Sequence, residues 1–309
     1  MKIAILGSGA MGSLFGAYLS QRNDVWLIDI DKQKVDRINS KGVTIIENDT
    51  RKLYRPKAVS DSAGLGKMDL IIVFVKSMHT IEALEQNRHL IGKNTYLITL
   101  QNGAGHESKL AKFTDKKNVL IGTTQHNSSI TAEGDILHGG GGNTTIGVIS
   151  GNSSRIRNIA LNFTSCGIET EVSDDVKRQI WTKLFLNTSA SSLTAILQVP
   201  LGFILENPHA SFLMESLARE AVKTANTECS DYFDENDVIN DIKTILKNAK
   251  GGYTSIYSDI KNGNYTEVDT ISGYVLEVAE KNGIPVPYHQ FVVSMIHALE
   301  DKAHASIIK

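Results

Sequence analysis

Short apolar runs alternate with segments of helical periodicity through the first half of the chain. The runs occupy residues 2–6, 24–29, 69–75, 95–100 and 119–122. They are apolar along their whole length instead of alternating with polar residues, which is typical of parallel strands covered on both faces. Helical spacing of apolar residues separates them, with predicted helices after residue 12 and at 31–40, 80–90 and 107–113. This order predicts an α/β fold with a doubly wound parallel sheet of the Rossmann type.

A glycine-rich stretch interrupts this pattern at residues 134–147. Four consecutive glycines, Gly139 to Gly142, separate two short β-like segments at 135–138 and 144–147. We predict a β-hairpin with a loose turn here. A phosphate-binding glycine loop is the alternative, but the Lys-Ser/Thr pair that such a loop requires does not follow the glycines.

The second half of the chain has a different pattern, because the strand signal disappears after about residue 173. Helical periodicity covers residues 176–188, 210–227, 235–247, 266–282 and 288–304, with proline or glycine breaks between several of these segments. We therefore predict a dinucleotide-binding Rossmann domain at residues 1–172 and an all-helical substrate and catalytic domain at residues 173–309.

Composition narrows the class of protein. The 309 residues carry a formal net charge of -2, with 41% hydrophobic and 21% charged residues. No excess of basic charge points to nucleic acid or to an anionic membrane as a partner. The longest apolar run, Leu70 to Val75, is too short to span a bilayer, and the N-terminus lacks the pattern of a signal peptide. The two cysteines form no C-x-x-C pair, so we expect a cytoplasmic protein without a metal site.

The sequence pattern G-x-G-x-x-G follows the first apolar run, at Gly7 to Gly12. By itself the pattern is weak, and a glycine-rich turn without a ligand is the alternative. Here a predicted strand precedes it and a predicted helix follows. In that context the first glycine permits the tight turn, the second lets the backbone approach a pyrophosphate and the third lets helix and strand pack closely. The predicted cofactor contacts are therefore Gly7, Ser8, Gly9, Ala10, Met11 and Gly12.

Two further residues bear on the cofactor. Asp29 ends the second apolar run, where a carboxylate accepts hydrogen bonds from ribose hydroxyls and repels a 2′-phosphate. It therefore favours NADH over NADPH, although Lys32 and Lys34 lie near enough to weaken that preference. Lys76 follows the third run, at the sheet edge where doubly wound folds bind ligands, and we predict a cofactor contact in preference to a solvated charge.

Three more stretches carry a resemblance to a known family. They are Leu100-Gln101-Asn102-Gly103, then Trp181-Thr182-Lys183-Leu184-Phe185-Leu186-Asn187, and finally Ser255-Ile256-Tyr257-Ser258-Asp259 with Thr266-Glu267-Val268-Asp269. Together they resemble the ketopantoate reductases, also called 2-dehydropantoate 2-reductases, over nearly the whole chain. The W-x-K-x-x-x-N pattern combined with S-x-x-x-D and T-E-x-D is far more specific than the glycines.

The resemblance implies a reaction and a set of roles. The family reduces 2-dehydropantoate to (R)-pantoate with NADPH, a step toward pantothenate and coenzyme A. It implies that Lys183 donates the proton, that Glu267 belongs to the catalytic centre, and that Ser255 holds the substrate carboxylate. It also implies that Asn102 and Asn187 bind the substrate, with Asn102 near the cofactor as well.

Elementary chemistry agrees with those roles. Hydride transfer to a ketone leaves charge on its oxygen, which a nearby ammonium stabilises and protonates. Lys183 and Asn187 stand four residues apart and so share one helix face. Glu267 could orient the ammonium, or it could be a capping or salt-bridging acid in its helix.

The chain departs from the family pattern at two positions. Ile30 stands where NADPH-dependent members commonly carry arginine, and Ser191 stands where the substrate helix usually has a second asparagine. Ser191 can still hydrogen-bond to substrate, but it reaches less far. Both departures suit an alternative, an NAD-dependent D-2-hydroxyacid dehydrogenase for branched or aromatic 2-oxo acids of the mandelate type.

Other functions are weaker hypotheses. A catalytically idle NAD(P)-binding sensor would have no need of a proton donor such as Lys183 beside a carboxylate clamp. Dehydrogenases for phosphorylated substrates, such as 6-phosphogluconate or glycerol-3-phosphate, would require a basic cluster that the motifs do not supply. The expected partner is a small 2-oxo acid, and because helical second domains often pair, a homodimer is the assembly to consider.

Overall fold

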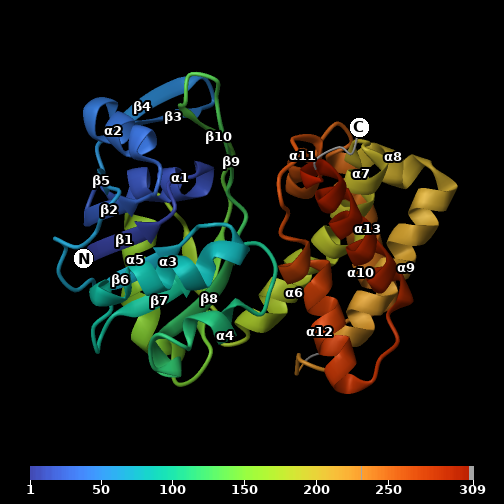
Figure 1. Ribbon diagram of the computed structural model, residues 1–309. Coiled ribbons are helices and arrows are strands. Elements are labelled where there is room, and N and C mark those ends of the chain that lie inside the picture. Colours follow the sequence, from blue (N-terminus) through green and yellow to red (C-terminus); the bar gives the residue numbers. More distant parts are fainter. Residues whose placement is uncertain (231, 306–309) are drawn as a thin grey trace. The chain divides into compact units, whose positions relative to one another are not determined.

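The computed structural model describes residues 1–230 and 232–305. The chain forms two compact units, which are best considered one at a time (Figure 1). The first comprises Met1–Gln101 and His106–Val176, and the second comprises Lys177–Lys309 together with the short segment Asn102–Gly105. That segment, although it follows a strand of the first unit, packs with the helices of the second.

An eight-stranded sheet forms the centre of the first unit, in the order β12-β11-β8-β7-β6-β1-β2-β5. All neighbouring strands are parallel except β8 and β11. This confirms the predicted doubly wound sheet. The strands are β1 (Lys2–Leu6), β2 (Asp24–Ile28), β5 (Lys57–Val59), β6 (Leu70–Val73), β7 (Tyr96–Thr99), β8 (Val119–Thr124), β11 (Thr144–Val148) and β12 (Thr170–Val172).

Alternate residues of these strands enter different hydrophobic cores because successive side chains point to opposite faces. In β1, Ile3 and Ile5 pack in one core with residues of α1 (Ala10–Leu19) and α5 (Arg157–Ser165). Ala4 and Leu6 pack in the other core with residues of α3 (Thr80–Gln86) and α4 (His106–Leu110). Burial on both faces explains why these strands read as continuous apolar runs.

A smaller, four-stranded sheet has the order β4-β3-β10-β9, and the sequence did not reveal it. Its strands are β3 (Val43–Glu47), β4 (Thr50–Tyr54), β9 (Asn127–Ile130) and β10 (Ile136–Gly140), and α2 (Lys32–Lys41) precedes them. The predicted hairpin at 134–147 is wrong. β10 pairs with β9 and β3 in this sheet, whereas β11 pairs with β8 and β12 in the large one. Each strand thereby buries its isoleucine, Ile136 or Ile146, in a core that an isolated hairpin could not provide.

The described part of the second unit is helical, as predicted. Its core includes Trp181, Phe185 and Met214, and Ala104 from the short segment joins it. The elements are α6 (Val176–Leu186), whose first residue belongs to the first unit, a single π-helical turn η5 (Asn187–Ser191), α7 (Ser192–Leu197), α8 (Leu201–Glu206), α9 (Pro208–Ala225), α10 (Glu235–Asn248), α11 (Ser255–Lys261), η6 (Val268–Thr270), α12 (Ser272–Asn282) and α13 (Pro287–His304).

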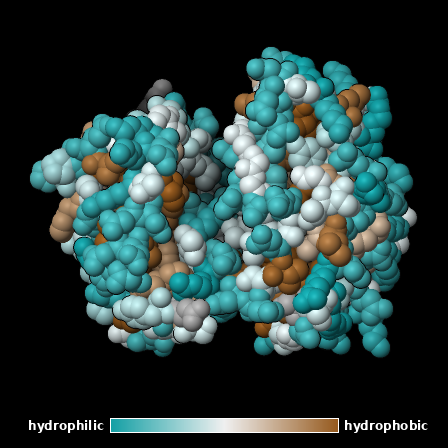
Figure 2. Space-filling model, turned by 180° about the vertical axis from the view of Figure 1, so that it is seen from behind, coloured by the Kyte–Doolittle hydropathy of each residue, from teal (hydrophilic) through white to brown (hydrophobic). Residues whose placement is uncertain are grey.

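On the face drawn in Figure 2, hydrophilic residues predominate and hydrophobic ones form small, separate groups. Among the residues that the structure describes, no helix is both long enough and apolar enough to cross a membrane.

Candidate active site

The glycine-rich loop joins β1 to α1, and at two of its positions there is no room for a side chain. Gly7 has φ of +96°, and a Cβ there would stand 2.8 Å from the backbone nitrogen of Val75. A Cβ at Gly12 would overlap the carbonyl oxygen of Gly7. A Cβ at Gly9, in contrast, would meet no atom within 4 Å, so its backbone faces open space at the start of α1. The loop therefore has the cradle that a pyrophosphate requires, next to the backbone N–H groups of a helix N-terminus.

A pocket of about 360 Å³ lies beside this loop, at the carboxyl ends of β1, β2 and β6. Gly7, Asp29 and Ile30 line it, as expected of a cofactor site, and Val75 contributes from the end of β6. Two further carboxylates, those of Asp61 and Glu82, also line the pocket. The sequence analysis did not predict either residue as part of the site. The short strand β5 before Asp61 was not recognised, and Glu82 lies within the predicted helix 80–90.

The Asp29 carboxylate is held by its own chain. Oδ2 accepts hydrogen bonds from the Ser8 N–H and hydroxyl, both at 2.8 Å, and from Lys34 Nζ at 3.1 Å. Oδ1 accepts from the Asp31 N–H at 3.0 Å. Burial raises the pKa of this carboxyl, but the hydrogen bonds from Asp31 and Ser8 and the Lys34 ammonium outweigh it, so the pKa lies below its usual value. Asp29 is therefore ionised at neutral pH and ties the second strand to the glycine-rich loop.

Gln101 organises the strand ends near Lys76. Its amide nitrogen donates to the Val75 carbonyl at 2.5 Å and to Thr80 Oγ1 at 3.0 Å, and its amide oxygen accepts from Thr99 Oγ1 at 2.8 Å. Lys76 follows Val75 and is partly buried at the start of a 3₁₀ turn. The motif residue Gln101, which received no role from the sequence, thus fixes the backbone that carries Lys76.

Asn102 is positioned by the helical unit. The Ala104 N–H donates to the Thr270 carbonyl at 2.8 Å, and Thr270 Oγ1 donates to the Asn102 carbonyl at 3.3 Å. Gly103 has φ of +90°, and a Cβ there would overlap the Thr270 carbonyl. The loop therefore follows the turn that contains Thr270, and Asn102 belongs to the same unit as Lys183.

Trp181 anchors the helix that carries Lys183. Its side chain is only 1% exposed, and its indole N–H donates to Glu228 Oε2 at 3.1 Å. The Tyr274 hydroxyl donates to the same oxygen at 2.8 Å. The tryptophan of the W-x-K-x-x-x-N pattern is thus a structural anchor that fixes the rotation of α6.

Lys183 is partly buried and interacts electrostatically with Glu267. Burial lowers the pKa of its ammonium, and the Glu267 carboxylate only partly opposes this, which leaves a pKa of about 8. The group is therefore mostly protonated at pH 7, yet it gives up its proton far more readily than an ordinary lysine. A lysine of this kind suits general acid catalysis near neutral pH.

Asn187 and Ser191 begin and end the π-helical turn η5 that continues α6. Asn187 is partly exposed, whereas Ser191 is only 5% exposed. Single π-helical turns within helices are frequent at functional sites. The periodicity of the sequence predicts a helix only as far as residue 188 and gives no sign of a π-helical turn.

The Glu267 turn is fixed by a buried carboxylate. Thr266 donates its N–H to Glu300 Oε1 at 2.7 Å, and Thr266 Oγ1 accepts from the Val268 N–H at 3.1 Å. Glu300, on α13, is a supporting residue that the motif pattern could not identify, because it lies 33 residues beyond Glu267.

Ser255 opens α11 and is exposed. The preceding Thr254 caps this helix by accepting the Tyr257 N–H at 3.2 Å, and its hydroxyl lies 2.9 Å from that of Thr194 on α7. This hydroxyl pair ties the start of α11 to α7, the helix that follows η5.

The described histidines offer no metal site. His126 and His138 stack and share a hydrogen bond of 3.0 Å, and His138 also contacts Tyr18 and Glu47. The described residues contain no group of three or more His, Cys, Asp or Glu side chains placed to hold a metal ion.

Comparison with known proteins identifies the family. The family model described as ketopantoate reductase PanE/ApbA matches residues 3–151, and its C-terminal counterpart matches residues 175–300. The chain belongs to the ketopantoate reductase family. A 2-dehydropantoate 2-reductase of Pyrococcus abyssi is 35% identical to it over 98% of this chain and 100% of that protein.

The fold of this chain is similar to solved structures of two differently named enzymes. The PanE/ApbA family ketopantoate reductase of Ralstonia eutropha JMP134 has a TM-score of 0.90 with 27% identity and covers 98% of this chain and 100% of its own. D-mandelate dehydrogenase, solved with NADH and anilino(oxo)acetate, has a TM-score of 0.91 with 30% identity over 98% of this chain and 99% of its own.

Proposed function

We propose that this protein is an NAD(P)H-dependent reductase of a small 2-oxo acid, with 2-dehydropantoate as the substrate and (R)-pantoate as the product. The observation that carries the proposal is Lys183, whose pKa of about 8 matches a proton donor working near neutral pH. The relatives named 2-dehydropantoate 2-reductase, which extend over nearly the whole chain, support the choice of substrate.

The residues of the helical unit have complementary roles in this proposal. When bound, the reduced nicotinamide supplies the hydride to the carbonyl carbon. The Lys183 ammonium stabilises the charge that develops on the carbonyl oxygen and then gives that oxygen its proton. Glu267 keeps the ammonium protonated and orients it. Asn102 and Asn187 donate amide hydrogen bonds to the substrate, Ser255 binds its carboxylate, and Ser191 lines the remainder of the site.

The first unit fits a dinucleotide, since the glycine-rich loop leaves open space at Gly9 and the adjoining pocket begins at Gly7. Residues Gly7 to Gly12 would hold the pyrophosphate, and Lys76 would contact the cofactor from the next strand end. Asp29 would accept a hydrogen bond from the ribose. Because the Ser8 hydroxyl and Lys34 already donate to its Oδ2, the ribose hydroxyl would replace one of them.

We infer that NADH is the preferred cofactor. Three carboxylates line the pocket, those of Asp29, Asp61 and Glu82, and a 2′-phosphate would add negative charge among them. Ile30 offers no positive charge in return. Lys34 does carry a positive charge, but it is already paired with Asp29 at 3.1 Å.

A second candidate function is an NAD-dependent D-2-hydroxyacid dehydrogenase for branched or aromatic acids. The acidic pocket and the short side chain of Ser191 favour it, and so does the likeness to D-mandelate dehydrogenase solved with NADH. Lys183 would then act in the oxidation of the 2-hydroxy acid, where its neutral amine accepts the proton of the hydroxyl group.

Location and assembly complete the proposal. We expect a cytoplasmic enzyme, since neither cysteine forms a disulfide. We also expect a homodimer, which analytical ultracentrifugation would test directly.

The deciding experiment compares substrates under steady-state conditions. The kcat/KM values for 2-dehydropantoate, phenylglyoxylate and 2-oxoisovalerate are measured with NADH and with NADPH. The highest kcat/KM for 2-dehydropantoate supports the leading proposal, whereas the highest kcat/KM for phenylglyoxylate or 2-oxoisovalerate supports the second candidate. Turnover of none of these acids would refute both.

A further inference from the structure

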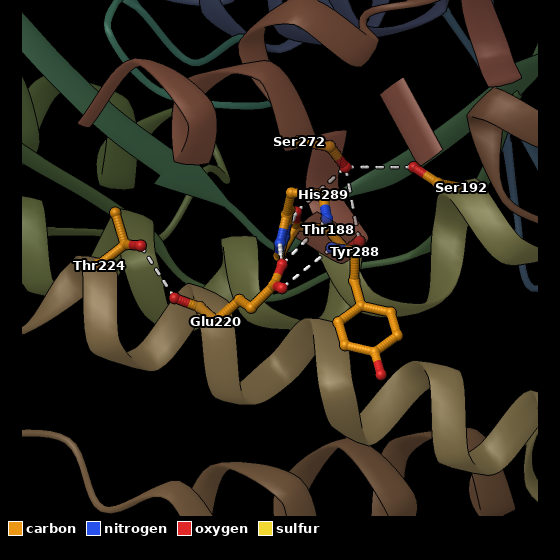
Figure 3. Close-up of polar contacts among 7 residues, drawn as sticks. All are labelled: Thr188, Ser192, Glu220, Thr224, Ser272, Tyr288 and His289. Carbon is orange, nitrogen blue, oxygen red and sulfur yellow. Dashed lines mark hydrogen bonds and ion pairs between the residues drawn. The ribbon is translucent and has the colours of Figure 1, made fainter. Parts of the chain in front are cut away.

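A chain of buried polar side chains, which includes Thr188 of the π-helical turn η5, joins elements of the helical unit (Figure 3). It begins at Glu220 on α9, continues through His289 on α13 and Thr188 in η5, and ends at Ser272 on α12 and Ser192 on α7. All five residues are buried, and four of them have no exposed surface. Five separate elements thus meet through hydrogen bonds inside an apolar core.

The Glu220 end of this network is rigid. Its carboxylate accepts the Tyr288 N–H on Oε1 at 3.0 Å and the His289 N–H on Oε2 at 2.9 Å. His289 Nδ1 lies 2.7 Å from Oε2, so it carries a proton and donates it. Burial lowers the pKa of His289 despite the opposing Glu220 carboxylate, which keeps the ring neutral with a bare Nε2.

The other end of the network consists of hydroxyl groups. His289 Nε2 lies 2.8 Å from Thr188 Oγ1, which is 3.1 Å from Ser272 Oγ. Ser272 Oγ is in turn 3.2 Å from Ser192 Oγ. The Thr188 hydroxyl has a single proton, and both the bare Nε2 of His289 and Ser272 Oγ lie within hydrogen-bond distance of it. The orientation of Glu220 and His289 therefore sets the surroundings of the hydroxyl on η5.

The hydroxyl groups stand next to the residues proposed to bind substrate. Thr188 follows Asn187, and Ser192 follows Ser191. Ser272 comes directly after the turn that begins at Glu267 and includes Thr270, which holds the Asn102 loop. Every segment that carries an assigned substrate-site residue of this unit, except Ser255, is therefore bonded to the network or adjoins it.

Stability alone does not explain such an arrangement. Buried polar groups gain little over apolar side chains of the same volume, and a partly satisfied network is worse than an apolar core. The network instead fixes the positions of these elements relative to one another, because hydrogen bonds are directional and hydrophobic contacts are not.

We propose that Glu220, His289, Thr188 and Ser272 form a positioning network, which sets the π-helical turn of Asn187 against the turn of Glu267 so that both side chains meet one substrate. The inference rests on the proposed function, since it assigns these residues to that same site. They are positioning residues, because their hydroxyl, imidazole and carboxylate groups act through Asn187 and Glu267.

The test uses three variants of the full-length protein. Thr188→Val keeps the shape of the side chain and removes its hydroxyl, and Thr188→Ser restores the hydroxyl. Thr224→Val is the matched control, because Thr224 is equally buried and its hydroxyl donates only to the Glu220 backbone carbonyl within the same helix, at 2.9 Å.

We expect Thr188→Val to raise the KM for the 2-oxo acid at least about tenfold, since small misplacements of binding groups are costly. The KM for NADH should stay within about twofold of wild type, and the pH dependence of kcat should not move. Thr188→Ser should recover most of the loss. Equal effects of Thr188→Val and Thr224→Val would overturn the inference.

A second readout does not depend on activity. Amide hydrogen exchange of residues 267–271 should accelerate in Thr188→Val but not in Thr224→Val, because only the former lies on the path to Ser272. Ser272→Ala removes the hydroxyl at the other end of the same hydrogen-bonded path and should accelerate exchange in residues 187–191. This variant replaces Thr188→Val in the test if Thr188→Val does not fold. Unchanged exchange in both variants refutes the positioning network, whereas a wild-type protein inactive on all 2-oxo acids refutes the proposed function instead.

Discussion

At the residue scale, two side chains carry most of the proposed chemistry, and their surroundings decide what each can do. Lys183 is an ordinary residue in the sequence, and only partial burial beside Glu267 brings the pKa of its ammonium to about 8. Asp29 was identified from its distance to the glycine-rich loop, but the structure shows its carboxylate already bonded to Ser8 and Lys34. Spacing from the glycine-rich loop singled out Asp29 and the family resemblance singled out Lys183, whereas their protonation and partners come from tertiary contacts.

The pKa of Lys183 predicts the pH dependence of the reaction. Reduction requires the ammonium, so kcat/KM for the 2-oxo acid should be constant below pH 8 and fall about tenfold per pH unit above it. Oxidation of the 2-hydroxy acid requires the neutral amine and should rise through the same pH range. Lys183→Ala should lower kcat by at least about a hundredfold, the usual contribution of an acid catalyst. A reduction profile flat to pH 10 in the wild-type enzyme would contradict this role.

Ile30 predicts cofactor preference. Ile30→Arg places a guanidinium at the mouth of the pocket, where a charge-assisted hydrogen bond to a 2′-phosphate contributes about 1.5–3 kcal/mol. The ratio of kcat/KM with NADPH to that with NADH should therefore rise at least about tenfold, and the KM for the 2-oxo acid should not change. Ile30→Leu is the control and should leave the ratio as in wild type. A wild-type enzyme that already prefers NADPH would show the inference about Asp29 to be wrong.

At the element scale, long elements with strong periodicity were predictable and short strands were not. The helix at 31–40 was expected from its pattern, and α2 occupies Lys32–Lys41 with Asp31 as its cap. The four-stranded sheet escaped notice because β4, Thr50–Tyr54, is largely exposed and polar. The glycine run at 139–142 suggested the loose turn of a hairpin, but it connects strands of two different sheets. Strand pairing depends on distant partners, which local patterns do not contain.

The loop between β1 and α1 predicts two different effects of alanine. Gly12→Ala forces a Cβ against the Gly7 carbonyl, so it should both destabilise the protein by about 1–3 kcal/mol, as overpacking does, and weaken cofactor binding. Gly9→Ala meets open space within the protein, so it should leave the melting temperature nearly unchanged while weakening NADH binding. Thermal denaturation and NADH fluorescence titration separate the two effects. Equal loss of stability in both variants would contradict this interpretation.

At the scale of the whole molecule, the chain divides its tasks between two compact units. Cofactor-binding residues predicted from the sequence lie in the first unit, apart from Asn102, and the proposed proton donor lies in the second. The segment Asn102–Gly105 departs from this simple division, because it follows β7 in sequence and packs with the helical unit. The predicted boundary at residue 172 could not include this exchange, since the sequence of the loop does not show which unit it packs with.

Cofactor binding predicts a change in the stability of the whole protein. NADH at about a hundred times its Kd should add about 2.7 kcal/mol to the free energy of unfolding of the unit that binds it, because only the folded form binds. Differential scanning fluorimetry should show a rise in melting temperature with NADH and a smaller rise with NADPH at the same concentration. The absence of any rise, in a protein that still turns over a 2-oxo acid with NADH, would contradict a site built by the folded first unit.

The sequence alone determined the fold class, the glycine-rich loop and the identity of the chemical groups, because periodicity and motif spacing are local properties of the chain. Tertiary structure decided which strands pair, where Asn102 belongs, how far the pKa of Lys183 falls and which buried hydroxyls support Asn187. Those features depend on burial and on partners far away in sequence, such as His289 for Thr188 and Glu300 for Thr266. They could be established only after the chain had folded and brought these groups into contact.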